Sequence, residues 1–237
     1  MLLKVLYADE HLVAIDKPAG LLVHRSQLDA QEEVFALQLL RDQLGRPVWP
    51  AHRLDKGTSG LLLFALSAEV ASALGQAFES GAMRKRYLAL VRGWTAEPEG
   101  LIDHALARDP ERPSAGQQLL PARTSWTRLA RVEWPLASDA RFPTTRGALL
   151  ECRPESGRRH QIRRHLKHIA HPIIGDATHG KGALNRALAA HLGRQRLWLH
   201  GLELALSHPV SGAALRLTAP LGPEWQALRS LGDWQNG

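Results

Sequence analysis

A single carboxylate between two cations is the feature of this sequence best suited to covalent chemistry. Asp55 lies between Arg53 and Lys56, and a glycine-flanked hydroxyl turn, Gly57-Thr58-Ser59-Gly60, follows it. Positive neighbours favour the ionised form of a carboxyl group, and an ionised aspartate held on a tight turn can act as a nucleophile. The same spacing also fits an ordinary turn or helix-capping aspartate, so the spacing alone leaves both interpretations open.

The segment Ser156–Leu166 carries a second concentration of functional side chains. Its apolar spacing predicts a helix over about Arg159 to Ala170, in which His160 and Arg163 point toward one site. Three other cations of this helix face outward, namely Arg159, Arg164 and Lys167. The neighbouring histidines have no carboxylate or thiol beside them and are crowded by arginines, which argues against a metal site. A nuclease that uses His160 and His165 as acid and base is a further hypothesis.

Two other candidates have plain structural alternatives. Tyr87, one of only two tyrosines, follows Arg84-Lys85-Arg86 in a predicted strand, and a tyrosine on a strand most often packs in a core or sheet. Near the N-terminus, Lys17-Pro18-Ala19-Gly20 interrupts a strand pattern that resumes through His24, because proline fixes one torsion and glycine frees another. We interpret Lys17 as either structural or phosphate-facing.

The apolar periodicity predicts elements of both kinds that position these side chains. The predicted strands are Leu2–Tyr7, Leu12–Asp16, Leu61–Ala65 after the Asp55 turn, Lys85–Val91, Arg123–Trp134 and Leu149–Arg153. The predicted helices are Val34–Leu44, Ala68–Glu79 with Ser67 as its N-cap, the helix over 159–170, and Pro223–Leu231. Residues 95–120 are rich in proline, glycine and polar side chains and have little periodicity, which predicts a mostly exposed connection.

The positive charge is concentrated in one part of the chain. The formal net charge is +7 over 237 residues, and residues 141–200 hold 12 Lys and Arg against 3 Asp and Glu. A basic protein with an unspecialised surface would spread this excess more evenly, whereas a local surplus is typical of an electrostatic footprint on nucleic acid. We therefore expect an RNA or DNA partner.

Several classes of function are disfavoured by what the sequence lacks. With Cys152 as the one cysteine, neither an intrachain disulfide nor a cysteine zinc site can form. No apolar run reaches membrane-spanning length, and the N-terminus has neither a signal-peptide pattern nor room for a presequence before the first predicted strand. Neither the Rossmann nor the P-loop glycine spacing occurs. We expect a cytoplasmic protein without a nucleotide cofactor, a metal or a membrane partner.

The motif His52-Arg53-Leu54-Asp55-x-x-Thr58-Ser59-Gly60 resembles the catalytic signature of the RluA family of pseudouridine synthases. Lys17-Pro-x-Gly-x-x-x-His24 resembles the first motif of this family, and Gly157-Arg-x-His-Gln-Ile-Arg163 its third. The resemblance covers roughly residues 5–220. It implies one α+β catalytic domain over 1–237, a mixed, mostly antiparallel bent sheet with flanking helices around a basic cleft, and no room for the small N-terminal RNA-binding domain that many relatives carry.

The resemblance also implies roles for individual residues. Asp55 corresponds to the nucleophile, Tyr87 to the tyrosine that stacks on the uracil and assists proton transfer, and Arg163 to the arginine that pairs with the nucleophile. Arg53 would fill the space of the flipped-out base, and Leu199 would pack against the uracil, although a core leucine is its default interpretation. The remaining RNA-binding candidates are His160, Arg159, Arg164, Lys17 and His24.

Three local features are most similar to a branch of this family that modifies uridine 65 in the T stem of tRNA: Val23–Asp29, Pro143–Arg146, and Arg163–Leu166 leading to His171–Gly180. The resemblance therefore implies tRNA as the partner and no cofactor. Two alternatives stay open: the same chemistry on ribosomal RNA, and a non-catalytic RNA-binding protein with this fold. The sequence does not decide whether Asp55 attacks the ribose or the uracil ring.

Overall fold

The computed structural model describes residues 1–24, 33–137, 141–180 and 182–236. These residues divide into two compact units. Unit 1 comprises Met1–Lys85 and His200–Pro220, and unit 2 comprises Arg86–Leu199 and Leu221–Gly237. The predicted Val23–Asp29 feature falls largely outside the described residues, which end at His24 and resume at residue 33. Each unit combines strands with helices.

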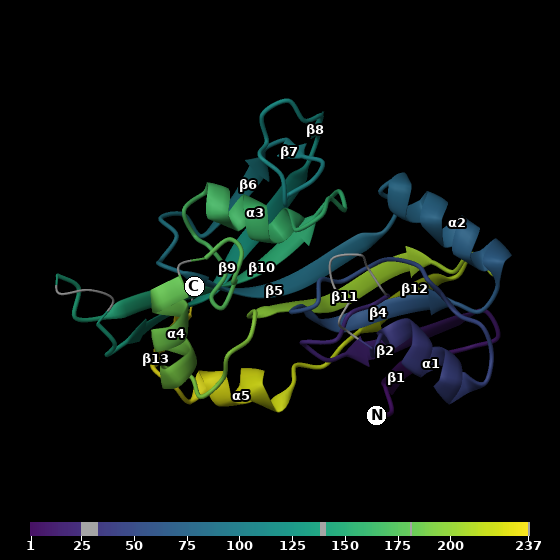
Figure 1. The fold of residues 1–237 in the computed structure, drawn as a ribbon, viewed down its shortest axis with the longest axis horizontal. Coiled ribbons are helices and arrows are strands. Elements are labelled where there is room, and N and C mark those ends of the chain that lie inside the picture. Colours follow the sequence, from purple (N-terminus) through teal and green to yellow (C-terminus); the bar gives the residue numbers. More distant parts are fainter. Residues whose placement is uncertain (25–32, 138–140, 181, 237) are drawn as a thin grey trace. The chain divides into compact units, whose positions relative to one another are not determined.

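Unit 1 is built on a sheet with the strand order β1-β2-β4-β11, to which β3 and β12 add at β4 and β11 (Figure 1). The strands are β1 (Lys4–Ala8), β2 (Leu12–Lys17), β3 (Trp49–Pro50), β4 (Ser59–Ala65), β11 (Leu199–Ser207) and β12 (Ala214–Thr218). Every residue of β4 is buried, because the strand has neighbours on both sides and helices over its face. It pairs in parallel with β11 and antiparallel with β2.

A capping residue marks one end of each helix of unit 1. The predicted helix over 68–79 is confirmed as α2 (Ala68–Glu79), and the Ser67 hydroxyl accepts a hydrogen bond from the Val70 amide at 3.2 Å. The helix predicted from Val34 begins two residues later, as α1 (Ala36–Leu44), and Gly45 ends it in the left-handed conformation at φ 65°.

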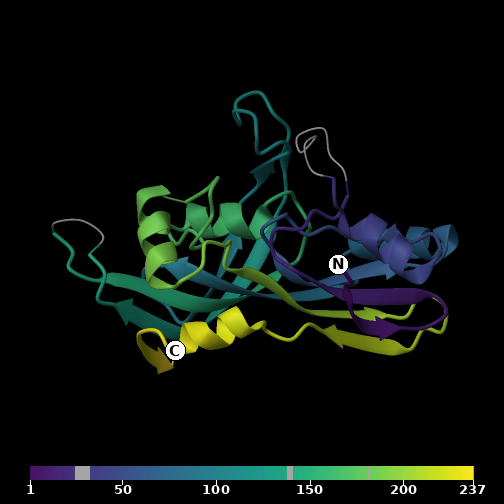
Figure 2. The ribbon, with the colours of Figure 1, turned by 60° about the horizontal axis from the view of Figure 1, so that its bottom comes forward.

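Unit 2 has the strand order β5-β10-β9-β13, with β6 beside β9 and a separate β7–β8 hairpin. Its strands are β5 (Arg84–Arg92), which begins at the end of unit 1, β6 (Glu99–Asp103), β7 (Leu106–Ala107), β8 (Leu119–Leu120), β9 (Arg123–Trp134), β10 (Thr145–Pro154) and β13 (Asp233–Asn236). Its helices are α3 (Gln161–His168), α4 (Gly182–His191) and α5 (Pro223–Arg229). Within this unit, Figures 1 and 2 show the β7–β8 hairpin extending from the strands beside α3.

Three predictions for unit 2 need correction. Residues 95–120 are mostly exposed, as predicted, but they contain regular structure, because β6 pairs with β9 along five residues and β7 pairs with β8. These strands escape a search for periodicity because β7 and β8 each have two residues and β6 is largely exposed at a sheet edge. The helix predicted over 159–170 is shorter at both ends, and neither α4 nor β13 was predicted.

The class predicted from the sequence is confirmed: strands and helices mix, and most strand pairs are antiparallel. The buried residues of unit 2 surround Trp134 and Trp198, whereas those of unit 1 lie between β2, β4, α2 and β11. Among the described helices, none combines the length and apolar character needed to cross a membrane.

Candidate active site

A buried lysine holds the loop that carries Asp55. Lys17 is 0% exposed, and its Nζ donates hydrogen bonds to the carbonyl oxygens of Pro18 at 2.9 Å, Leu21 at 2.7 Å and Lys56 at 3.3 Å. The Gly20 amide donates to the same Lys56 carbonyl at 2.8 Å. Three carbonyls satisfy a buried ammonium. These contacts support the structural interpretation of Lys17, and its contact with RNA stays a prediction.

The turn after Asp55 requires glycine at position 60. Gly60 has a φ of 107°, and a Cβ atom there would lie 2.3 Å from the Gly201 carbonyl oxygen, so both the torsion and the close approach of β11 exclude a side chain. Beside it, the Ser59 hydroxyl lies 2.9 Å from His200 Nδ1 in the buried interior. The nucleophile turn is thus fastened to β11 of the same unit.

Asp55 is half-buried on this turn, and its carbonyl accepts a hydrogen bond from the Thr58 amide at 3.0 Å. Arg53 is exposed two residues before it. Partial burial and the charge of Arg53 together lower the pKa of His24. Unit 1 therefore brings three predicted site residues to one area: Asp55, Arg53 and His24.

Two residues behind the loop were missed by the sequence analysis. The centroids of the His52 and Phe78 rings lie 5.0 Å apart, and His52 Nε2 accepts a hydrogen bond from the Leu63 amide at 3.1 Å. Burial, together with the charge of Lys85, lowers the pKa of His52 to about 4, and burial lowers the pKa of Lys85 to about 8. At neutral pH His52 is therefore a neutral hydrogen-bond acceptor. Its position directly before Arg53 in the motif was the available signal.

In unit 2, Tyr87 and Leu199 lie against the main apolar core. Tyr87 is half-buried on β5, opposite Cys152 of β10, so its ring has the packing role that a strand tyrosine usually has. Leu199 is 4% exposed at the start of β11. Their predicted roles toward a uracil stay predictions.

The start of α3 holds His160 in an unusual conformation. His160 has a φ of 54°, in the left-handed region that non-glycine residues seldom adopt. The buried Gln161 side chain fixes the turn by accepting hydrogen bonds from the Ser156 hydroxyl at 2.8 Å and the Arg158 amide at 2.9 Å, while its amide nitrogen donates to the Arg123 carbonyl. Backbone strain of this kind persists only where the surroundings impose it, and it is common at functional sites.

Arg163 forms a bidentate salt bridge with Asp176, a residue to which the sequence analysis gave no role. Arg163 Nε lies 2.7 Å from Asp176 Oδ2, and Nη2 lies 2.8 Å from Oδ1. Burial alone would raise the pKa of the Asp176 carboxyl, but the hydrogen bonds and charge of Arg163 outweigh it and hold that pKa below its usual value. The predicted pairing of Arg163 with Asp55 joins residues of different units and stays a prediction.

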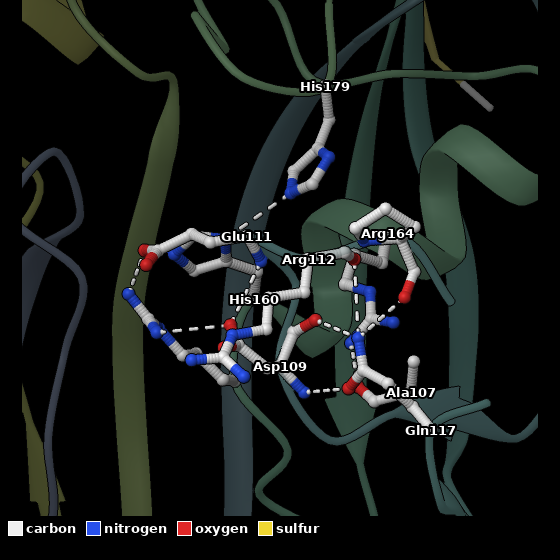
Figure 3. A network of polar contacts seen from close by, with 10 residues as sticks. Ala107, Asp109, Glu111, Arg112, Gln117, His160, Arg164 and His179 are labelled. Atoms are coloured by element: carbon white, nitrogen blue, oxygen red, sulfur yellow. Dashed lines mark hydrogen bonds and ion pairs between the residues drawn. The ribbon is translucent and has the colours of Figure 1, made fainter. Parts of the chain in front are cut away.

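A polar network links α3 to the β7–β8 hairpin (Figure 3). Arg159 forms ion pairs with Glu111 and Asp109, and Arg164 Nη1 donates to the Ala107 carbonyl at 2.9 Å. Beside this network, His160 Nδ1 lies 3.3 Å from His179 Nε2. Unit 2 therefore gathers three of the predicted RNA-binding residues, Arg159, His160 and Arg164, around the N-terminal half of α3.

The structure does not fit the nuclease hypothesis. His165 is 0% exposed, with Nδ1 2.9 Å from the Thr124 hydroxyl and Nε2 3.0 Å from the His104 carbonyl oxygen. Both ring nitrogens are therefore engaged inside the protein, and His165 cannot serve a substrate as acid or base. Among the residues that the structure describes, no group of three histidine, cysteine or carboxylate side chains is placed to hold a metal ion.

Comparison with known proteins assigns the class of the chain. A family model described as RNA pseudouridylate synthase matches residues 11–168, a range that contains the Asp55 loop, Tyr87 and Arg163. The chain belongs to this family.

The chain is 47% identical over 238 residues to tRNA pseudouridine synthase C of Yersinia pestis, covering 98% of this chain and 92% of that protein. It is 45% identical to the protein of the same name from Vibrio cholerae, covering 99% and 97%. With the one from Pectobacterium carotovorum it shares 47% identity, and here the chain spans 63% of the relative's length. Among solved structures, human RNA Pseudouridylate Synthase Domain Containing 4 superposes with a TM-score of 0.70 at 25% identity, covering 95% and 93% of the two chains.

Proposed function

We propose that this protein isomerises a uridine of tRNA to pseudouridine, with uridine 65 in the T stem as its target. The observation that carries the proposal is the Asp55 loop, in which a half-buried carboxylate lies on a turn whose backbone is held by the buried Lys17 ammonium, through the Lys56 carbonyl, and by the approach of Gly60 to Gly201. A nucleophile must be held in a fixed position to react. The names and the identity of the bacterial relatives support tRNA as the substrate.

The reaction needs neither an oxidant nor a group donor. The bond between uracil N1 and ribose C1′ breaks, the base turns, and a bond from C5 to C1′ replaces it, while the proton of C5 leaves and N1 gains one. In this proposal Asp55 attacks the ribose or the ring, Tyr87 stacks on the base and assists removal of the C5 proton, and Arg163 keeps Asp55 ionised. Leu199 packs against the flipped-out uracil, and Arg53 fills the space that it leaves.

The same proposal places the enzyme in the cytoplasm and assigns both units to one catalytic domain. It requires no metal and no nucleotide cofactor. The surplus of cations in residues 141–200, which include α3, supports an RNA partner.

Carbodiimide mapping of pseudouridine tests the proposal directly. Unmodified tRNA and ribosomal RNA are incubated with the pure protein, with Asp55→Asn as the parallel sample. We expect one new reverse-transcription stop in the tRNA T stem with the wild-type protein and none with the variant, since the amide cannot act as the nucleophile.

Other outcomes separate the alternatives. A stop in ribosomal RNA alone would keep the chemistry and reject the tRNA target. RNA that is bound but unmodified in both pools would reject the isomerase and favour a binding protein with this fold. A stop that persists with Asp55→Asn would remove Asp55 as the nucleophile.

A further inference from the structure

A cavity of about 570 Å³ lies between α3 and the β7–β8 hairpin of unit 2. Its charged and titratable lining consists of Arg112, Arg164, Lys167, His104, His168 and His179, and no carboxylate side chain is among the described residues that line it. Such a lining attracts anions. Of the predicted RNA-binding residues only Arg164 lines this cavity, and none of the catalytic roles proposed above uses it.

The walls of the cavity are fixed by hydrogen bonds rather than left as a gap between loops. The Gln117 side chain closes the hairpin: its Oε1 accepts the Asp109 amide at 2.8 Å, and its Nε2 donates to the carbonyls of Asp109 and Pro113, both at 2.9 Å. Arg164 fastens the hairpin to α3 through the Ala107 carbonyl. Figure 3 shows the two contacts, Gln117 with Asp109 and Arg164 with Ala107. The cavity is therefore built before any ligand arrives.

The hairpin's own carboxylates neutralise a different part of α3. Glu111 and Asp109 pair with Arg159, and Asp109 also lies 3.3 Å from Arg112 Nε. In the part of the chain that the structure describes, neither Arg164 nor Lys167 forms an ion pair with a carboxylate. The positive charge on the cavity side of α3 is thus left uncompensated by the protein.

Two imidazoles complete the chemical character of the site. The rings of His104 and His168 stack with centroids 3.8 Å apart and an interplanar angle of 15°. Histidine rings are among the side chains on which unpaired RNA bases stack. A volume of about 570 Å³ exceeds what a lone phosphate needs and has room for a nucleotide.

We propose that this cavity binds one nucleotide of the RNA strand, with its phosphodiester group on Arg164 and Lys167. The inference rests on the proposed function, because it takes RNA as the substrate, and it adds a subsite in unit 2, built from other residues than the Asp55 loop of unit 1. Each phosphate that a protein cation neutralises releases a counterion, so the affinity for RNA depends on salt in proportion to the number of such contacts.

The test compares two double variants with the same loss of charge. Arg164→Gln with Lys167→Gln removes the cavity cations, whereas Arg194→Gln with Arg229→Gln removes two exposed cations of unit 2 that do not line the cavity. Binding of an unmodified tRNA transcript is measured by fluorescence anisotropy over a range of KCl concentrations. The plot of log K against log [KCl] has a negative slope. We expect the magnitude of this slope to decrease by about two in the cavity variant, one for each cation, and by much less in the control.

Two further measurements locate the contact. In ethylation interference, wild-type binding is blocked by ethylation of particular tRNA phosphates, and we expect one or two of these positions to become insensitive in the cavity variant alone. Replacing chloride by inorganic phosphate at equal ionic strength separates a free-anion site from an RNA site. Competition by phosphate with an unchanged ethylation pattern would overturn the RNA assignment.

The single variant Lys167→Gln guards against a folding artefact, because Lys167 is exposed on α3 and, unlike Arg164, holds no part of the hairpin in place. A slope lower by about one in this variant supports the subsite. Equal slopes in all variants, with pseudouridine still formed by the wild-type protein, would overturn the subsite and leave the proposed function intact. A slope change without any pseudouridine would reject the proposed function and keep the subsite.

Discussion

Asp55 and Arg164 both belong to the predicted RNA-contacting set, yet the structure holds their surroundings by different interactions. The Asp55 loop is fixed from inside, by hydrogen bonds from the buried Lys17 ammonium to backbone carbonyls and by the packing of Gly60 on Gly201. The surface around Arg164 is held by the hydrogen bond from Arg164 to the Ala107 carbonyl and by partly exposed ion pairs of Arg159, just before α3, with Asp109 and Glu111 of the β7–β8 hairpin. The first set is shielded from solvent, whereas salt screens the second.

This difference separates two tasks within the protein. The reaction slows when a nucleophile is displaced by even a small distance. Buried hydrogen bonds that salt and pH do not weaken are therefore suited to holding the Asp55 loop. A surface that captures a polyanion needs charges that exchange partners as the RNA arrives and leaves. The comparison also singles out an exception, since the Arg163–Asp176 ion pair of α3 is itself buried.

The largest effect is expected from Asp176→Asn. This change removes the Asp176 carboxylate from its bidentate pair with the buried Arg163 guanidinium, and breaking a buried pair on one side costs roughly 3–5 kcal/mol of the free energy of unfolding. Urea unfolding followed by tryptophan fluorescence reports mainly on unit 2, since six of the seven tryptophans lie in Arg86–Leu199 and Leu221–Gly237. As a control, Asp103→Asn removes an exposed partner of Arg123 and should cost no more than about 1 kcal/mol.

The pH dependence of this pair has a definite sign. Because the folded protein holds the pKa of Asp176 below its ordinary value of 3.8, the stabilisation is complete above about pH 4 and is lost as the pH falls toward the folded pKa. Asp176→Asn should therefore flatten the fall in stability between about pH 4 and pH 2. Equal free energies of unfolding for Asp176→Asn and the wild-type protein at neutral pH would contradict the view that this pair is structural.

A smaller effect is expected from Lys17→Met, which tests the inner support of the Asp55 loop. Three carbonyls lose their buried donor while the cost of burying an ammonium disappears, so the free energy of unfolding should fall by roughly 2–3 kcal/mol. Hydrogen exchange should accelerate at the Gly20 amide, which shares the Lys56 carbonyl with Lys17. The rate of pseudouridine formation should fall as the loop loosens.

Salt dependence decides between the two interpretations of Lys17. A lysine that holds only carbonyls leaves the slope of log K for tRNA against log [KCl] unchanged, whereas loss of a phosphate contact would lower it by about one. Lys4→Met provides the matched control, because Lys4 is an exposed lysine of the same unit. A lower slope in Lys17→Met would return Lys17 to the RNA-binding set.

Local patterns predicted much of what the structure contains. The Ser67 cap, the α2 helix and the strand after the Asp55 turn all follow from residues within a few positions of one another. The contacts that hold the site do not. Arg163 meets Asp176 13 residues later, and Arg159 meets Glu111 48 residues earlier. A single charged residue in a loop belongs to no periodic pattern, so the sequence does not predict which distant residue it will pair with.

Lys17 illustrates the same limit from the opposite side. Its neighbours predict a turn, and a lysine in a turn is ordinarily exposed. Only the carbonyl of Lys56, which is 39 residues distant, completes the set of acceptors that makes burial of the ammonium stable. The sequence therefore located the Asp55 loop, but the side chain that supports it could be recognised only from the tertiary structure.

The smallest effect is expected from the pH dependence of tRNA binding at the cavity beside α3. Burial, with the charges of His168 and Arg164, lowers the pKa of His104, so its ring is neutral at neutral pH. The other charged or titratable groups around it are Arg112, Lys167 and His179, which line the cavity, and His165, whose ring contacts the His104 carbonyl. A bound phosphodiester adds negative charge and raises that pKa, so RNA binding takes up a proton and strengthens as the pH falls.

We therefore expect wild-type affinity for tRNA to gain about threefold more than that of His104→Gln between pH 7.5 and pH 5.5. Anisotropy titrations at constant ionic strength measure this difference, with His191→Gln of α4 as the control, since His191 does not line the cavity. Parallel pH profiles for the wild-type protein and His104→Gln would mean that no phosphate sits close to this ring. The cavity beside α3 would then bind RNA through its arginine and lysine charges alone. The pH dependence of binding would not distinguish this cavity from the Asp55 loop.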